Sequence, residues 1–271
     1  MITRESIRKL AILQQTTEQN VAREYAQHLF LAGFYQQRGA QKVMFKGGTA
    51  LRIVYHSPRF SEDLDFSGFG VTVRQIEDWV AEAIGRMEQA GVSTSIRERK
   101  RSSGGYLGIL EPTIADYQVR TLLEVSLRRK EAPKPRGVLI GSDLLPAYTL
   151  VPLPESVLVD EKLQALLTRK KPRDFFDCYF MLRKGMIPPA KRKLLRQVKE
   201  ALLGTQLNFK AELGDFLPRS HQAILSDFKQ QLLAELEHYT WAAVPQAPSH
   251  HAQCLVTPPY RRRVKVIRAP A

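Results

Sequence analysis

The sequence is short of cysteine, of long apolar runs and of acidic charge, and it has no internal repeat. Its two cysteines, Cys178 and Cys254, lie far apart, which argues against a disulfide framework or a thiolate metal site and fits a reducing compartment. No run reaches the roughly 18–20 apolar residues of a transmembrane helix, and the N-terminus carries no apolar signal core. We therefore expect a cytoplasmic protein without a membrane partner.

The shortage of acidic residues leaves a strongly basic chain. There are 41 lysines and arginines against 27 aspartates and glutamates, giving a net charge of +14 and a pI near 9.9. Such an excess indicates a polyanionic partner, most simply nucleic acid, although an acidic protein partner or a generally basic surface also fits. The 271 residues, 44% of them apolar, suffice for one large globular domain or two small ones.

The most informative stretch runs from an apolar strand through two glycines to a pair of aspartates. Residues 43–45 predict a short buried strand that breaks at Gly47-Gly48 and restarts as a short helix over 50–55. A second strand follows, in which Asp63 and Asp65 alternate with apolar residues. Because side chains alternate along a strand, both carboxylates are expected on one face.

This pattern suits magnesium and phosphate. Two carboxylates about 7 Å apart on one face repel each other unless a cation lies between them, and Mg²⁺ (or Mn²⁺) takes such oxygen ligands. Glycines let a phosphate approach backbone N–H groups, here at Gly47, Gly48 and Thr49 beside Lys46. Asp63 and Asp65 are therefore predicted metal ligands for a bound nucleoside triphosphate. The other interpretation is a tight turn and a solvated acidic strand end.

Hydrophobic spacing predicts the remaining elements and their division. Strand patterns stop near two prolines, Pro152 and Pro154, so we expect an α+β chain with an α/β domain over 1–150, a helical domain over 151–243 and a basic, proline-rich tail over 244–271. The predicted helices cover 3–39 (with Thr17 as a candidate cap), 71–89 (ending at Gly91), 154–170, a segment from 173 onward, 189–203 and 217–238; the predicted strands cover 92–99, 106–114, 118–128, 138–140 and 148–151.

Several charged residues outside the first motif are further candidates. Glu124 lies inside an apolar strand pattern, where a carboxylate is costly unless it binds a metal or pairs with Arg120 or Arg128. Lys162 and Arg169 lie two turns apart on one helix face and can neutralise a triphosphate.

Two aspartates near the start of the next helix complete the set. Asp174 and Asp177 are one turn apart and share a face, although acidic residues also favour an ordinary helix N-terminus. Arg173 is expected to be a charge partner.

These residues together resemble a known family. Gly47-Gly48-Thr49 followed by Arg59-Phe60-Ser61-Glu62-Asp63-Leu64-Asp65-Phe66, then Glu161-Lys162-Leu163 with Arg169, then Arg173-Asp174-Phe175-Phe176-Asp177, are similar to three motifs of the AbiEii/AbiGii nucleotidyltransferase toxins. That family belongs to the polymerase-β-type nucleotidyltransferase superfamily. The resemblance covers about residues 20–240, and the gap between glycines and aspartates is somewhat longer than usual for the superfamily.

The resemblance implies a fold, a reaction and partners. The expected fold is a polymerase-β-like nucleotidyltransferase domain, with a mixed sheet flanked by helices, followed by a helical domain. The expected reaction transfers a nucleoside monophosphate from a triphosphate with Mg²⁺ to an RNA acceptor, such as tRNA, in a toxin–antitoxin or abortive-infection system with a cognate antitoxin. Lys162 becomes the triphosphate-binding lysine, Asp174 the essential aspartate with Asp177 as its alternative, and Glu124 the third carboxylate.

Two other functions fit the sequence. The first is a nucleotidyl- or phosphotransferase that modifies proteins or itself, since Thr49, Ser57 and Ser61 supply hydroxyls near the predicted site. The second is a non-catalytic module that binds nucleic acid or a protein partner on the same scaffold. The intact set of Asp63, Asp65, Lys162 and Asp174 argues against this loss of catalysis.

Overall fold

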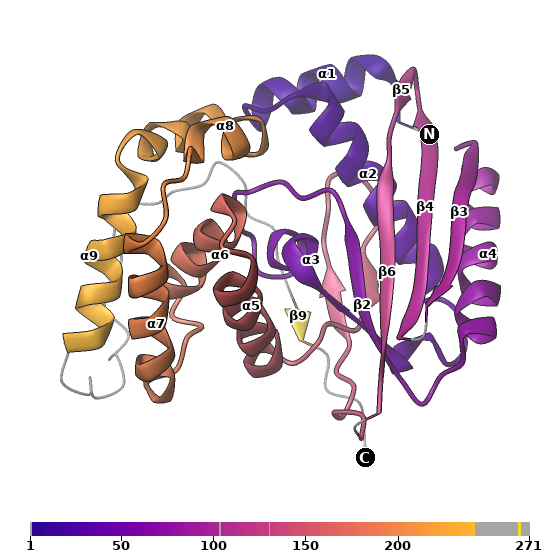
Figure 1. The fold of residues 1–271 in the computed structure, drawn as a ribbon. Coiled ribbons are helices and arrows are strands. Elements are labelled where there is room, and N and C mark those ends of the chain that lie inside the picture. The colour runs from indigo at the N-terminus through magenta and orange to yellow at the C-terminus, as the bar shows by residue number, and fades with distance from the viewer. Residues whose placement is uncertain (1, 103, 130, 242–264, 267–271) are drawn as a thin grey trace.

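A computed structural model describes residues 2–102, 104–129, 131–241 and 265–266. It has the expected α+β architecture, with a mixed sheet and its helices in the first half and a group of helices in the second (Figure 1). Within these described ranges, no helix combines the length and apolarity needed to cross a membrane.

The main sheet is mixed and has the order β1-β2-β6-β4-β3, with β5 paired to β4. β2 and β6 run parallel, and the other pairs are antiparallel. Its strands are β1 (Val43–Lys46), β2 (Leu64–Phe69), β3 (Thr94–Ser102), β4 (Gly105–Ile114), β5 (Tyr117–Gln118) and β6 (Thr121–Arg128). A small second sheet has the order β8-β7-β9, from β7 (Val138–Ile140), β8 (Tyr148–Leu150) and β9 (Lys265–Val266).

One face of the main sheet carries the first hydrophobic core. The helices α2 (Glu18–Phe34) and α4 (Val73–Gln89) pack against it, and Phe34 meets Phe66 of β2 with ring centroids 5.5 Å apart. The helical segment predicted over 3–39 divides into two helices, because α1 (Arg4–Leu13) ends in a turn where Gln15 has a φ of +54°. Thr17 then caps α2 as predicted, accepting a hydrogen bond from the backbone N–H of Asn20.

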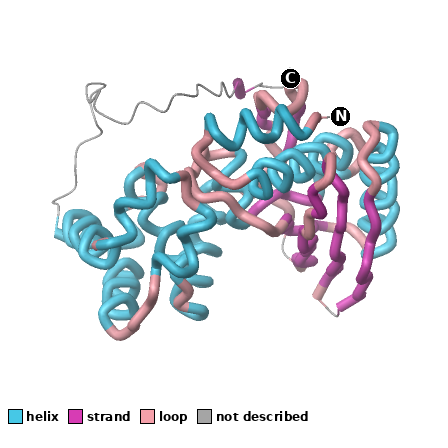
Figure 2. The backbone as a smooth tube through the Cα atoms, turned by 90° about the horizontal axis from the view of Figure 1, so that it is seen from above, coloured by secondary structure: helices cyan, strands magenta, loops and turns pink. Residues whose placement is uncertain are grey.

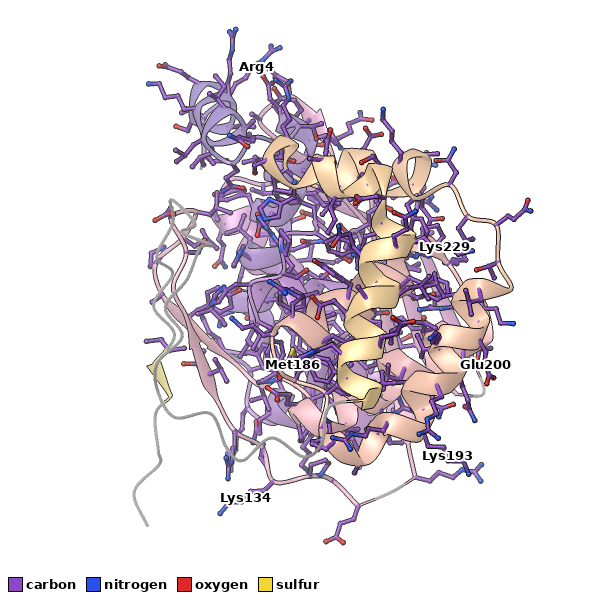
Figure 3. The ribbon with its side chains drawn as sticks, turned by 90° about the vertical axis from the view of Figure 1, so that its left-hand side faces the viewer. Arg4, Lys134, Met186, Lys193, Glu200 and Lys229 are labelled. Atoms are coloured by element: carbon purple, nitrogen blue, oxygen red, sulfur yellow. The ribbon has the colours of Figure 1, made fainter. Side chains whose placement is uncertain are left out.

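The second half is helical. It contains α5 (Glu155–Arg169), α6 (Pro172–Arg183), α7 (Arg192–Leu203), α8 (Phe209–Leu213) and α9 (Phe228–Trp241), which lie together at the end of the molecule away from β3 (Figures 1 and 2). The predicted helix over 217–238 is wrong in its first part, since Arg219–Ser226 is a 3-10 helix. In Figure 3, Lys193 and Glu200 of α7 point outward, while Leu195, Val198 and Leu202 are buried beneath them.

The two halves are joined along β1. The backbone N–H of Phe45 donates to the carbonyl of Val151 at 2.8 Å, and that of Leu153 donates to the carbonyl of Phe45 at 2.8 Å. Met44 of β1 packs in the hydrophobic core of the helical half. These contacts fix the start of α5 beside the strand that precedes the glycines.

The division near residue 150 remains a prediction. The hydrophobic core of the helical half also contains residues of the first half, such as Met44. In the tail, Lys265 and Val266 pair with β7, and Cys254 lies outside the described residues.

The loop between the glycines and the aspartates is fastened by Arg52. Its guanidinium forms a two-point ion pair with the buried Glu24, at 3.0 and 3.1 Å, and lies 3.8 Å over the ring of Phe60. It also donates to the carbonyls of Ser57 and Pro58.

We expect Arg52→Ala to lower the free energy of unfolding by about 3–5 kcal/mol, because it removes the cation from a buried carboxylate. Lys9→Ala is the control, since Lys9 pairs with Glu5 at an exposed site and such pairs contribute about 0–1 kcal/mol. Urea unfolding of both variants measures this difference. Equal small losses would show that Arg52 does not hold the loop.

Candidate active site

A row of charged residues crosses the sheet face opposite α2 and α4. Lys46 of β1 pairs in register with Asp65 of β2, and Asp65 pairs with Glu124 of β6. Residues paired across strands project to the same face. The row therefore lies on the side where Met44 contacts the helical half, and α5 of that half brings its own charged side chains to the row.

The two glycines make room for charged side chains. Gly47 has a φ of +82°, and a Cβ there would collide with Oδ2 of Asp65. A Cβ on Gly48 would lie 2.5 Å from Nη2 of Arg59 and 2.7 Å from Oγ of Ser61. Neither position tolerates a larger residue without a shift of the site.

The helix after this turn begins earlier than predicted. α3 (Gly47–Ile53) starts at the first glycine, whereas the sequence predicts a start at residue 50. Thr49 is fully buried, and its hydroxyl donates to the backbone carbonyl of Asp63. The Thr49 side chain thus holds the backbone at Asp63. Because its hydroxyl is used in this way, only the backbone N–H of Thr49 could contact a phosphate.

The aspartate pair is electrostatically strained. Asp65 lies within β2, while Asp63 precedes the strand, which starts one residue later than predicted. Burial raises the pKa of Asp65 to about 6, with further raising by Asp63 and Glu124 and opposing effects of Lys162 and Lys46. Burial also raises the pKa of Asp63. The ionised pair is therefore unfavourable until a cation joins it.

A buried ion triad brings the second motif to the first. Asp177 of α6 accepts from Nε and Nη2 of Arg59, at 2.9 and 3.1 Å, and from Nζ of Lys162 of α5 at 2.7 Å. Although burial acts to raise the pKa of Asp177, Arg59 and Lys162 together hold it below the ordinary value. Lys162 also lowers the pKa of Asp65, so the charge of the lysine acts on this candidate metal ligand at one site.

The other aspartate of α6 pairs with the other predicted cation. Nη2 of Arg169 lies 2.6 Å from Oδ1 of Asp174, while the buried Oδ2 has no hydrogen-bond partner among the described residues. The two helices are thus joined by two ion pairs, and Asp177, not Asp174, contacts Lys162. Arg173 is half-buried and lowers the pKa of Asp63, as expected of a charge partner.

Glu161, which directly precedes Lys162, forms a second charged cluster. Its Oε2 accepts from Nζ of Lys46 at 2.8 Å, and its Oε1 accepts from Nη2 of Arg128. Arg128 also donates from Nε to Oγ of Ser67 at 3.1 Å. Adjacent residues of α5 therefore reach two separate clusters beside Asp65.

Glu124 is exposed, although the sequence predicts a buried carboxylate. The apolar neighbours Leu123 and Val125 point to the opposite face, into the core behind the sheet. Arg128, one of its expected partners, pairs with Glu161, and Glu124 accepts a 3.3 Å hydrogen bond from the Ser126 hydroxyl.

Within the described part of the chain, no three Asp, Glu, His or Cys side chains gather as a metal centre. The Asp63–Asp65 pair still fits Mg²⁺, which keeps several waters and takes substrate phosphate oxygens to complete six ligands. The mutual repulsion of the carboxylates is the feature that a divalent ion would relieve.

Sequence reasoning passed over Arg59, Glu161 and Arg128 as site residues. Arg59 and Glu161 lie within the motifs that carry the family resemblance, but 118 residues separate Arg59 from its partner Asp177. Only the fold shows that each reaches a cluster beside Asp65.

Comparisons with known proteins identify a family and a fold. The family model described as "Nucleotidyl transferase AbiEii toxin, Type IV TA system" matches residues 29–246. The crystal structure of JHP933 from Helicobacter pylori is 18% identical with a TM-score of 0.57, covering 83% of this chain and 93% of that one. A "putative nucleotidyltransferase" from H. pylori is 20% identical with a TM-score of 0.58, covering 83% and 96%. No curated protein matches the sequence.

Structures at such low identity inform on fold alone, and these two confirm the expected fold. The family model covers most of the chain and all three motifs. The chain therefore belongs to the AbiEii family of nucleotidyl transferase toxins from type IV toxin–antitoxin systems.

Proposed function

We propose that this nucleotidyltransferase toxin transfers a nucleoside monophosphate from a Mg²⁺-bound triphosphate to a hydroxyl group of an RNA, with tRNA as the expected acceptor. The acceptor oxygen bonds to the α-phosphorus and loses its proton, and pyrophosphate leaves. The observation that carries the proposal is the meeting of Lys162 with Asp65: Asp177 holds the lysine at 2.7 Å, and the lysine's positive charge lowers the pKa of the buried Asp65.

The residues divide into roles around the reacting phosphate. Asp63 and Asp65 would hold Mg²⁺, which supplies charge neutralisation on the triphosphate and on the leaving pyrophosphate. The backbone of Gly47, Gly48 and Thr49 would contact phosphate oxygens. Lys162 would bind the triphosphate as Asp177 orients it.

The outer residues of the site have supporting roles. Arg169, held by Asp174, is half exposed and lies two turns along α5 from Lys162, so it would contact the triphosphate or the acceptor. Glu124 lies beside Asp65 on the open face and would be the third carboxylate.

The RNA acceptor is supported by charge. The net charge of +14 favours a polyanion over a small neutral acceptor. A cognate antitoxin as partner follows from the type IV toxin–antitoxin family.

We expect label from an α-³²P-labelled nucleoside triphosphate to appear on RNA. The purified protein is incubated with each of the four triphosphates, total RNA and Mg²⁺, and RNA and protein are separated on denaturing gels. Sequencing of RNA 3′ ends then identifies the acceptor. Label found on protein alone would replace the RNA proposal by protein or self modification.

Replacing Asp65 by asparagine should abolish transfer and stabilise the protein. Loss of a metal-binding carboxylate is expected to lower the rate by at least roughly 10³-fold. The folded state keeps the Asp65 proton up to about pH 6, whereas the ordinary pKa is 3.8, so stability falls as pH rises between these values.

Without metal at pH 7, Asp65→Asn should therefore raise the free energy of unfolding by about 1–3 kcal/mol. Asp116→Asn is the control, because this aspartate is exposed and should change neither quantity by more than about 0.5 kcal/mol. Retained transfer, or an asparagine variant no more stable than the parent, would contradict the role given to Asp65.

The same pKa predicts how metal binding depends on pH. Because Mg²⁺ needs the ionised carboxylate, affinity for Mg²⁺ with triphosphate should weaken as pH falls below about 6, by up to about tenfold per pH unit. Calorimetric titrations between pH 5 and pH 8 measure this slope, which should be smaller in Asp65→Asn, where Asp63 is the remaining carboxylate of the pair. A flat profile in the parent protein would exclude Asp65 as the titrating ligand.

A further inference from the structure

We propose that Arg128 and Lys46 form a binding site for the two outer phosphates of the triphosphate, and hence for the leaving pyrophosphate, with Glu161 as the positioning residue. The inference deepens the proposed function and rests on it, because it assumes a nucleoside triphosphate as the substrate. It adds a pair of cations to Lys162, and both are held by Glu161, the residue that precedes Lys162 on α5.

The cluster is built from four elements, β1, β2, β6 and α5. Glu161 of α5 accepts from Nζ of Lys46 at 2.8 Å with one oxygen and from the guanidinium of Arg128 with the other. The hydroxyl of Ser67 on β2 accepts from Nε of Arg128 at 3.1 Å. Arg128 is thus fixed at two points, by Ser67 on the sheet and by Glu161 on α5, and both cations are held in place before any ligand arrives.

The charge balance favours an anion. One carboxylate, Glu161, faces two cations, so the cluster carries an excess of about one positive charge. A phosphate can therefore join it without displacing Glu161, using guanidinium and ammonium hydrogens that the carboxylate leaves over. Pyrophosphate, with several negative charges, matches this excess better than the single phosphodiester of an acceptor.

Accessibility separates this cluster from the other one. The side chains of Arg59, Asp177 and Lys162 are 6%, 2% and 11% exposed, whereas those of Arg128 and Glu161 are 35% and 30% exposed, with Lys46 at 14%. The triad of Arg59, Asp177 and Lys162 is mostly buried, which suits holding the fold and presenting one lysine. The cluster around Glu161 is open on its Arg128 side, from which a ligand can enter.

Position on the sheet connects the cluster to the reacting end of the triphosphate. Lys46 lies opposite Asp65 in the β1–β2 register, and Arg128 ends β6, the strand on the other side of β2. Glu161 is next to Lys162 in the chain. The outer phosphates would lie over this strip when the α-phosphate lies at the aspartates.

The alternative is a purely structural network that ties α5 to the sheet. The test must therefore measure ligand binding separately from stability. Inorganic pyrophosphate with Mg²⁺ is the probe, because its binding needs neither an acceptor nor the transfer reaction. Arg129 supplies the matched control: it is the next residue, it is exposed, and its replacement removes the same charge.

We expect Arg128→Met to weaken pyrophosphate binding by about tenfold or more in calorimetry, and Arg129→Met by less than about twofold. Arg128→Lys should be intermediate, since it keeps the charge but cannot contact Ser67 and Glu161 together. In the transfer assay, Arg128→Met should raise KM for the triphosphate more than it lowers kcat. Thermal unfolding of each variant, with saturating pyrophosphate and without it, shows whether the variant is folded under the conditions of the binding measurement.

Two results would overturn the inference. One is parent-like pyrophosphate affinity in both Arg128 variants, which would leave the cluster as a structural tie. The other is an equal loss in Arg128→Met and Arg129→Met, which would reduce the effect to general charge. If no acceptor is labelled but pyrophosphate binding depends on Arg128, the proposed reaction fails while the phosphate site stands.

Discussion

The structure depends on the buried triad of Arg59, Asp177 and Lys162. It joins the loop after the glycines, the helix α6 and the helix α5, all within hydrogen-bonding distance. Breaking such a buried set by removing one partner is costly, whereas its net contribution to stability when complete is small. Its main consequence is therefore geometric, since it fixes a lysine from one half of the chain beside an aspartate from the other.

The residues of the site lower the stability of the free protein but favour the binding of metal and phosphate. Asp65 is held where burial and two neighbouring carboxylates oppose its charge, and Gly47 permits the close approach that burial requires. On the opposite side, Glu161 and Asp177 each face two cations, so positive charge is left over. Such an arrangement of raised-pKa acids beside cations with spare positive charge gains stability when metal and substrate bind, as expected of a metal-dependent transferase.

Much of the fold and part of the site could be predicted from the sequence. The glycine pair, the aspartates and Lys162 carry local spacing signals, so their motifs and the surrounding strands were found. Helix breaks were missed where a non-glycine residue such as Gln15 takes a positive φ. The orientation of Glu124 was missed because period-2 alternation shows that faces differ, and only packing decides which face is buried.

The central claim is that Lys162 and Asp65 act on one metal-bound nucleotide, and a double-mutant cycle tests it most directly. Affinity for a Mg²⁺ complex of an α,β-methylene triphosphate analogue is measured by calorimetry for the parent, Asp65→Asn, Lys162→Met and the double variant. The account predicts that the double variant loses less than the sum of the single losses, by more than about 1 kcal/mol. Single losses that add within about 0.5 kcal/mol would contradict a shared site.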